Sequence, residues 1–263
     1  TSVKQPDEVF ASGGGIQWLP EHFVWRDTVV DGRPVRAWWG NYPDAWRAIN
    51  FPRLYLSSIF VAVVGTFGQV LTSSMAAYAF ARLRFPGRDK LFFAYLATMM
   101  VPGSVTMIPV FVIMKHLGWI NTYQALIVPG LFSAYGTFML RQFFMGIPSE
   151  LSDAARVDGA GDGLILWRII LPMARPALAV VALFQFMWTW SEYLGPLIYL
   201  SDSAKYTVTL GLSKFGGDWK GATLDRYTWF MAATASMTVP ILVLFFFVQR
   251  SFIEGISLTG LKG

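Results

Sequence analysis

The sequence contains no cysteine, only two histidines and few charged residues. Without cysteine the chain can form neither a disulfide framework nor a thiolate metal site. His22 and His116 lie far apart, which disfavours a histidine metal site or a Ser-His-Asp triad. Charged residues make up 14% of the 263 residues, against about 25% in a typical soluble domain. The net charge of +5 is spread along the chain and forms no basic stripe for nucleic acid.

The sequence is instead rich in apolar residues. Hydrophobic residues make up 54% of the chain and the mean hydropathy is +0.47, a balance typical of a membrane protein. A helix that crosses the hydrocarbon layer needs about 20 predominantly apolar residues. Prolines within such stretches are tolerated and often mark bends. We expect five membrane spans, at Ser57–Ala81, Leu91–Met114, Gln124–Leu140, Ala177–Leu200 and Trp229–Val248.

The loops between these stretches predict the orientation, because cytoplasmic loops are enriched in lysine and arginine. Arg82–Lys90 holds four cations in nine residues, whereas the next loop, Lys115–Tyr123, holds one. We therefore expect Arg82–Lys90 and residues 141–175 to lie in the cytoplasm. Residues 1–53 would then lie outside the cell, yet they carry no signal peptide. The sequence thus predicts a sixth span upstream of Thr1.

Residues 1–53 form a predicted extracytoplasmic segment, and residues 54–263 form the predicted transmembrane domain. Within the outer segment, two β-prone runs flank Asp31-Gly32, a pair that favours a tight β-hairpin turn. Residues Asn41–Phe51 are typical of a short amphipathic helix lying on the surface. Two roles remain open for the segment, a cap on the outer helix ends or a docking surface for an extracytoplasmic partner.

A polar, glycine-rich stretch, Ser152–Pro172, separates two apolar regions on the predicted cytoplasmic side. Ser149 is a candidate N-cap for a first helix, and Gly159 suits a left-handed residue after its end. Asp162 is a candidate cap for a second helix, Gly163–Ile170, which the following proline would end. The sequence predicts two short helices joined by a glycine turn outside the lipid. Helical spacing places Leu151, Ala154, Ala155 and Asp158 on one small, mostly apolar face.

This stretch resembles the EAA loop in the membrane subunits of binding-protein-dependent ABC importers. The family pattern is Glu-Ala-Ala, three residues, Gly, nine residues, and Ile-x-Leu-Pro; here aspartate replaces the glutamate. The stretches "MMVPGSVTMIPVF" and "WTWSEYLGPLIYL" resemble the carbohydrate, maltose-type branch of this family. The coupling residues that the resemblance implies are Asp153, Ala154, Ala155, Arg156, Gly159, Ile169, Leu171 and Pro172.

The resemblance implies an all-α, multi-pass helix bundle of the type I importer kind in a prokaryotic cytoplasmic membrane. Its coupling loop, residues 148–172, would contact two separate ATPase subunits that bind ATP and magnesium. A second, homologous permease and an extracytoplasmic solute-binding protein are the other implied partners. The chain itself has no Walker A motif, because "GGDWKGAT" at Gly216–Thr223 lacks the required order. We therefore expect it to be no enzyme and to hold no cofactor or metal.

Glu192 is the one ionisable residue within the five predicted spans. Such residues usually face a cavity or a partner. With Trp188, Trp190 and Tyr193 beside it, Glu192 is a candidate for the translocation path of a sugar, and an interhelical hydrogen bond is the structural alternative. An alternative function is an ion- or proton-coupled secondary transporter that uses Glu192. An intramembrane enzyme is disfavoured because the spans contain no paired carboxylates, and a scaffold leaves the loop unexplained.

Overall fold

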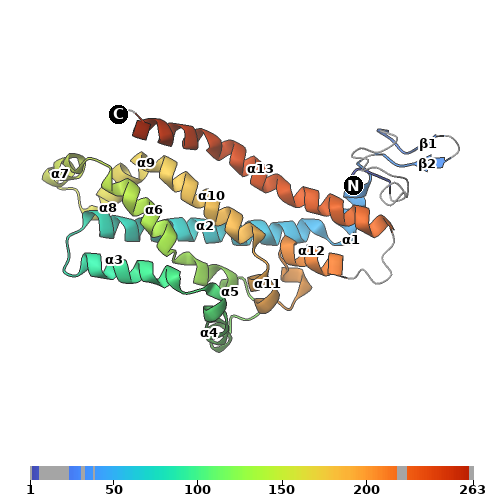
Figure 1. Cartoon of the computed structure of the whole chain (residues 1–263), viewed down its shortest axis with the longest axis horizontal. Coiled ribbons are helices and arrows are strands. Elements are labelled where there is room, and N and C mark those ends of the chain that lie inside the picture. Colours follow the sequence, from blue (N-terminus) through green and yellow to red (C-terminus); the bar gives the residue numbers. More distant parts are fainter. Residues whose placement is uncertain (1, 6–23, 31–32, 38, 218–223, 261–263) are drawn as a thin grey trace. The chain divides into compact units, whose positions relative to one another are not determined.

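A computed structural model describes residues 2–5, 24–30, 33–37, 39–217 and 224–260 (Figure 1). Within these residues the regular secondary structure is helical apart from one pair of short strands. The chain divides into two compact units, Thr1–Ile59 with Leu200–Leu242 and Phe60–Tyr199 with Val243–Gly263. The helices α2 (Phe51–Arg82) and α13 (Leu224–Gly260) each contribute residues to both units.

The first unit contains a two-stranded ribbon at the predicted hairpin position. Strands β1 (Thr28–Val30) and β2 (Arg33–Val35) pair antiparallel, with Thr28 opposite Val35. The two expected turn residues lie outside the described residues. The predicted amphipathic helix is present as α1 (Asn41–Ala48), which buries Asn41 and Ala45. The other elements of this unit are η5 (Ser203–Lys205), α12 (Val208–Gly217) and the first part of α13.

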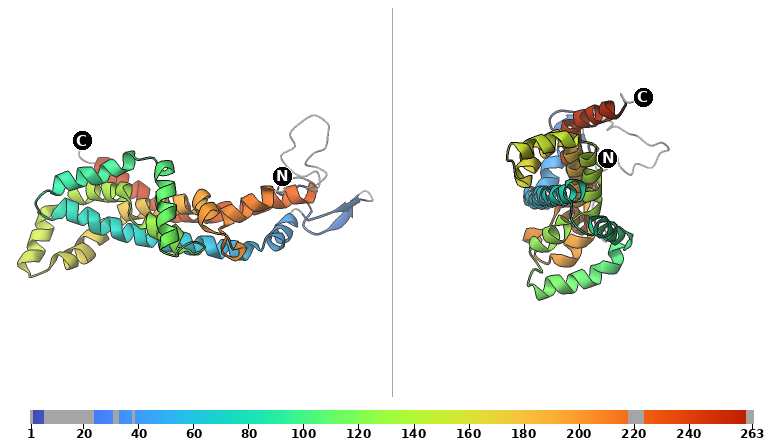
Figure 2. Two further views of the ribbon diagram at one scale, coloured as in Figure 1. Left: turned by 90° about the horizontal axis from the view of Figure 1, so that it is seen from below. Right: turned by 90° about the vertical axis from the view of Figure 1, so that its left-hand side faces the viewer.

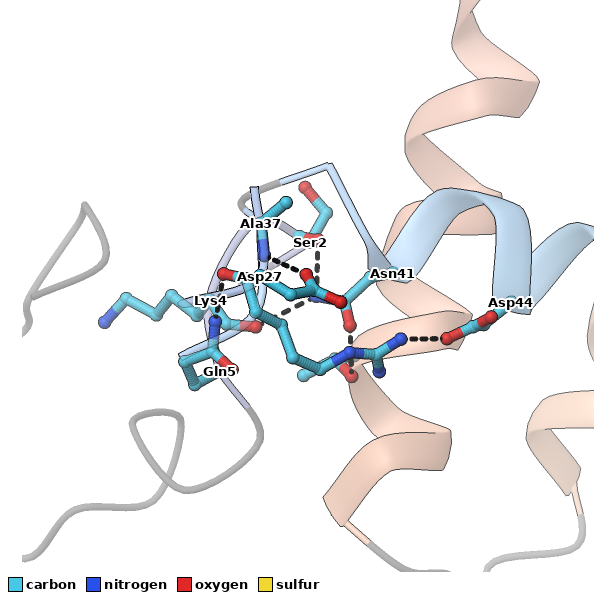
Figure 3. Close-up of polar contacts among 9 residues, drawn as sticks. Ser2, Lys4, Gln5, Asp27, Ala37, Asn41 and Asp44 are labelled. Carbon is cyan, nitrogen blue, oxygen red and sulfur yellow. Dashed lines mark hydrogen bonds and ion pairs between the residues drawn. The ribbon is translucent and has the colours of Figure 1, made fainter. Parts of the chain in front are cut away.

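Buried polar side chains connect the elements of the first unit (Figure 3). The Asn41 amide nitrogen donates to the carbonyl oxygens of Ser2 and Lys4, at 3.0 and 2.9 Å. The Thr228 hydroxyl of α13 donates to the Asn41 side-chain oxygen at 3.4 Å. The Ser58 hydroxyl of α2 accepts from the backbone N–H of Val208 at 2.7 Å, which satisfies an amide at the start of α12.

The second unit is a set of helices packed on the C-terminal part of α2. Its core contains Ala77 and Tyr78 of α2, Leu140 of α6, Ile170, and Val181 of α10. Figures 1 and 2 show α6 and α10 beside this part of α2. The elements are α3 (Arg88–Ala97), η2 (Thr98–Met100), α4 (Gly103–His116), α5 (Gln124–Ile127), η3 (Val128–Leu131), α6 (Ala134–Met145), α7 (Ser149–Val157), α8 (Asp162–Ile165), the π-helical turn η4 (Leu166–Ile170), α9 (Leu171–Met173), α10 (Arg175–Ser191) and α11 (Leu194–Tyr199).

By length and composition, two helices among the described residues are able to cross a membrane, Phe51–Arg82 and Arg226–Gln249. Two bent pairs would raise the number to four if each pair is one span. The first pair joins Arg88–Met100 to Gly103–His116 at 99°, and the second joins Asp162–Met173 to Arg175–Ser191 at 82°. The bend of the first pair falls at Pro102, inside a predicted span. The number of five spans is therefore not confirmed.

Two further predicted spans are also wrong as single helices. Residues 124–140 are divided among α5, η3 and α6, because Pro129 lacks an N–H and Ser133 begins a new helix as its N-cap, accepting from the Gly136 N–H at 3.0 Å. Residues 177–200 are divided between α10 and α11, with Glu192 in extended backbone between them. Both segments are apolar enough to look continuous in sequence, but local backbone chemistry interrupts them.

Candidate functional site

The first half of the segment 148–172, hereafter the helix-pair segment, is the helix α7. Its N-cap is Pro148, and no side-chain bond caps it, so Ser149 is the first helical residue and not the predicted cap. Its end follows the prediction, because Gly159 has φ +82°. The Gly159 N–H donates to the Arg156 carbonyl at 3.0 Å and the Ala160 N–H to that of Ala155 at 2.8 Å. This pair of bonds is a Schellman motif, which stops the helix and reverses the chain.

The second half runs through α8, η4 and α9. Gly161 is the N-cap, so the prediction that Asp162 caps this helix was wrong, and Asp162 is the first helical residue. The helix also continues past Pro172 to Met173. Pro172 has no N–H to bond the Arg168 carbonyl, and the π-helical turn before it accommodates that loss.

A polar network connects the two halves to each other and to α2. The Arg156 guanidinium lies 3.1 Å from Asp153 Oδ1 and 3.1 Å from Asp162 Oδ1. The Tyr78 hydroxyl of α2 donates to Asp162 Oδ1 at 3.0 Å. The Asp162 hydrogen bond is the main cause that raises the pKa of Arg156. The helix-pair segment is therefore joined to α2 by side-chain bonds as well as by the backbone.

The structure brings the eight predicted coupling residues into this one segment. Ala155, Ile169 and Leu171 pack partly against the core of the second unit. The other five are exposed: Asp153, Ala154, Arg156, Gly159 and Pro172. On the predicted contact face of α7, only Ala155 is half-buried, so the rest of that face is open to a partner.

Sequence reasoning missed three exposed apolar side chains in this segment, on Val157, Leu164 and Trp167. Val157 is 88% exposed although it is fully apolar. Six of the seven residues from Leu164 to Ile170 are apolar, so helical spacing alone does not tell which of them face outward. An exposed group of large apolar residues marks a protein or membrane contact.

The residues predicted for the translocation path do not form one exposed cluster. Trp188 is 72% exposed, whereas Trp190 is 1% exposed and stacks on Phe186 with ring centroids 5.6 Å apart. Glu192 Oε1 accepts from the Gly195 N–H at 2.9 Å, so this carboxylate satisfies an amide in the first turn of α11. Tyr193 is half-buried. Among the described residues, no group of three or more metal-ligating side chains is close enough to hold a metal ion.

These features define a class: a helical membrane protein with an exposed helix pair that is bonded to the long apolar helix α2. Residues 69–257 match the family of binding-protein-dependent transport system inner membrane components, and the chain belongs to this family.

Relatives of known role are similar over most of their length. The arabinooligosaccharide transport system permease protein AraQ of Halalkalibacterium halodurans is 35% identical over 207 residues, 79% of this chain and 73% of that protein. The lactose transport system permease protein LacG of Rhizobium radiobacter is 35% identical over 219 residues, 83% of this chain and 79% of that protein. A solved bacterial ABC transporter involved in importing the polysaccharide alginate matches with a TM-score of 0.73 and 26% identity, covering 82% of this chain and 80% of that one.

Proposed function

We propose that the chain is a permease subunit of an ATP-driven importer and that it forms half of a translocation path for a carbohydrate or related solute. The names of the similar proteins support this class of solute, since they include transporters of arabinooligosaccharides and lactose. The family supports the view that this chain does not hydrolyse ATP itself, because its members are inner membrane components of transport systems. ATP and magnesium would bind to separate ATPase subunits.

The observation that carries the proposal is the exposed, anchored geometry of the helix-pair segment. Ala154 and Val157 are exposed on the outer side of α7, while Ala155 packs against the core of the second unit. A small apolar surface of this kind suits insertion into a groove of a partner. The Tyr78–Asp162–Arg156 contacts then make the helix pair a lever on α2. Closure of the ATPase subunits would shift the lever and bias the membrane helices between two states.

The remaining partners follow from the same assignment. A second, homologous permease would complete the path, and an extracytoplasmic solute-binding protein would deliver the solute on the side where residues 1–53 lie. We assign the aromatic contacts of the path to Trp188 and Tyr193, with Glu192 as a hydrogen-bond acceptor for hydroxyl groups. Trp190 is left out of this assignment because its ring is buried within the chain.

Site-specific cross-linking tests the contact with the ATPase directly, because residues 1–263 contain no cysteine. Ala154→Cys and Val157→Cys introduce single thiols on the exposed side of α7. Met100→Cys is the matched control, since Met100 is 84% exposed but lies far along the chain at the bend after α3. With a short thiol-to-amine cross-linker in membranes, we expect both α7 variants to capture the ATPase subunit and the control to capture none.

Equal capture by all three variants, or capture by the Met100→Cys control alone, would reject the proposed docking surface. The cross-linked species must have the mass of one permease plus one ATPase subunit. Mass spectrometry of the linked peptides then identifies the ATPase residues in contact with α7.

A further inference from the structure

A cavity of about 810 Å³ lies between the loop that follows α2 and the start of α7, within the second unit. Four arginines and two serines line it, together with two aspartates and three apolar residues. The proposed coupling function uses Arg156 and its two aspartate partners from this lining. It leaves the other cationic and hydroxyl groups without a role.

The charges around the cavity do not cancel. Asp153 and Asp162 are both paired with Arg156. Arg82 and Arg84 also line the cavity, and neither forms an ion pair with any other described residue. A fourth arginine in the lining is paired with an exposed aspartate outside it. The cavity therefore carries excess positive charge.

Arg82 is held in place although it has no acidic partner. Its guanidinium donates to the carbonyl oxygens of Phe144, at 2.6 Å, and Ile147 at the end of α6. Its Nε is buried and makes no hydrogen bond to the described residues. These contacts orient the guanidinium while they leave its charge unneutralised.

The start of α7 supplies uncharged donors to the same cavity. Ser152 lines the cavity and is 2% exposed, yet its hydroxyl has no hydrogen-bond partner among the described residues. The N-cap residue Pro148 offers no side-chain acceptor, so no N-cap side chain bonds the first N–H groups of this nine-residue helix. A buried hydroxyl without a partner destabilises the fold, and a bound acceptor would relieve that cost. Helix N-termini with nearby cations are favourable sites for phosphate.

We propose that this cavity binds a phosphate group, and that the headgroup of an anionic phospholipid supplies it. The run Ser57–Ala81 of α2 carries no charge, and Arg82 is the first cation after it, which places the cavity where headgroups begin. Leu83 and Phe85 add apolar surface to the lining, as an amphiphilic ligand requires. Basic pockets at the cytoplasmic ends of membrane helices bind lipid headgroups. Only the assignment to the cytoplasmic leaflet rests on the proposed function.

Lipid selectivity of the full chain, purified with its bound partner subunits, tests this site. In nanodiscs, spin-labelled phosphatidylglycerol and phosphatidylcholine report the fraction of each lipid held at the protein surface. We expect phosphatidylglycerol to be preferred, and Arg84→Gln and Ser152→Ala each to reduce the preference at least about threefold. Arg168→Gln is the matched control, because Arg168 is exposed on the same segment but lies outside the cavity lining. It should leave the preference unchanged.

A second arm adds inorganic phosphate at millimolar concentration. Displacement of the labelled lipid, again weakened by Arg84→Gln, would support a phosphate site while reassigning its natural ligand to a soluble anion. An equal lipid preference in all variants would overturn the site. Loss of the ATPase subunit from Arg84→Gln with unchanged lipid preference would also overturn it, in favour of a protein contact. Failure of the α7 cross-links leaves these lipid measurements unaffected, so the two proposals fail separately.

Discussion

The helix-pair segment and the break between α10 and α11 each place an acidic residue within an apolar region. The two acidic residues find different kinds of hydrogen-bond partner. In the helix-pair segment, Asp162 bonds to side chains from two other helices, α2 and α7. At the break, Glu192 bonds to the backbone only three residues away. The first arrangement links three helices to one another, whereas the second stabilises a local bend.

The two segments also differ in which of their apolar side chains are exposed and which are buried. Around α7, Leu151, Ala154 and Val157 are small or apolar and yet exposed, while Ala155 packs against the core. Around the break, two tryptophans two residues apart have opposite environments, one exposed and one buried. An apolar residue in such a segment is therefore informative about function only when its exposure is known.

The largest expected effect concerns the two tryptophans at the break. Trp190→Ala removes a fully buried ring that stacks on Phe186, which should lower stability by about 3 kcal/mol or more. Trp188→Ala removes an exposed ring and should leave stability nearly unchanged while it lowers transport. Thermal unfolding in detergent and solute uptake in proteoliposomes measure the two effects. If Trp188→Ala is destabilised and solute uptake is normal, Trp188 serves packing and does not line the translocation path.

A smaller effect is expected at Glu192. Glu192→Ala removes the acceptor for the Gly195 N–H and should cost about 1 kcal/mol, as the loss of a helix cap does. Glu192→Gln keeps an oxygen at this position and should preserve stability, so it isolates the role of the charge. We expect Glu192→Gln to retain ATP-driven uptake. Uptake that depends on a proton gradient, and is abolished by Glu192→Gln, would instead favour a secondary transporter.

Much of the helix-pair segment could be predicted from sequence because its signals are local. Gly159 indicated a left-handed residue, and the bonds around it complete the helix stop that the sequence predicted. The bonding of Asp162 could not be predicted, because its partner Tyr78 lies 84 residues away. Nothing in the spacing of the apolar run showed that Trp167 points outward.

The helix breaks were missed for a different reason. Hydropathy averages over about 20 residues, so it cannot detect the interruption at Pro129 or the extended backbone at Glu192. Sequence thus predicted the composition of the bundle and its exposed segment better than the continuity of its helices.

The most direct test is the ratio of solute imported to ATP hydrolysed in proteoliposomes that contain the assembled transporter. Gly159→Val puts a β-branched residue at φ +82°, whereas Gly118→Val creates the same strain at φ +69° in the loop after α4, with no atom near either new Cβ. We predict that Gly159→Val lowers the ratio at least about tenfold and that Gly118→Val leaves it near the natural value. A normal ratio in Gly159→Val would contradict the account of the helix-pair segment as the lever.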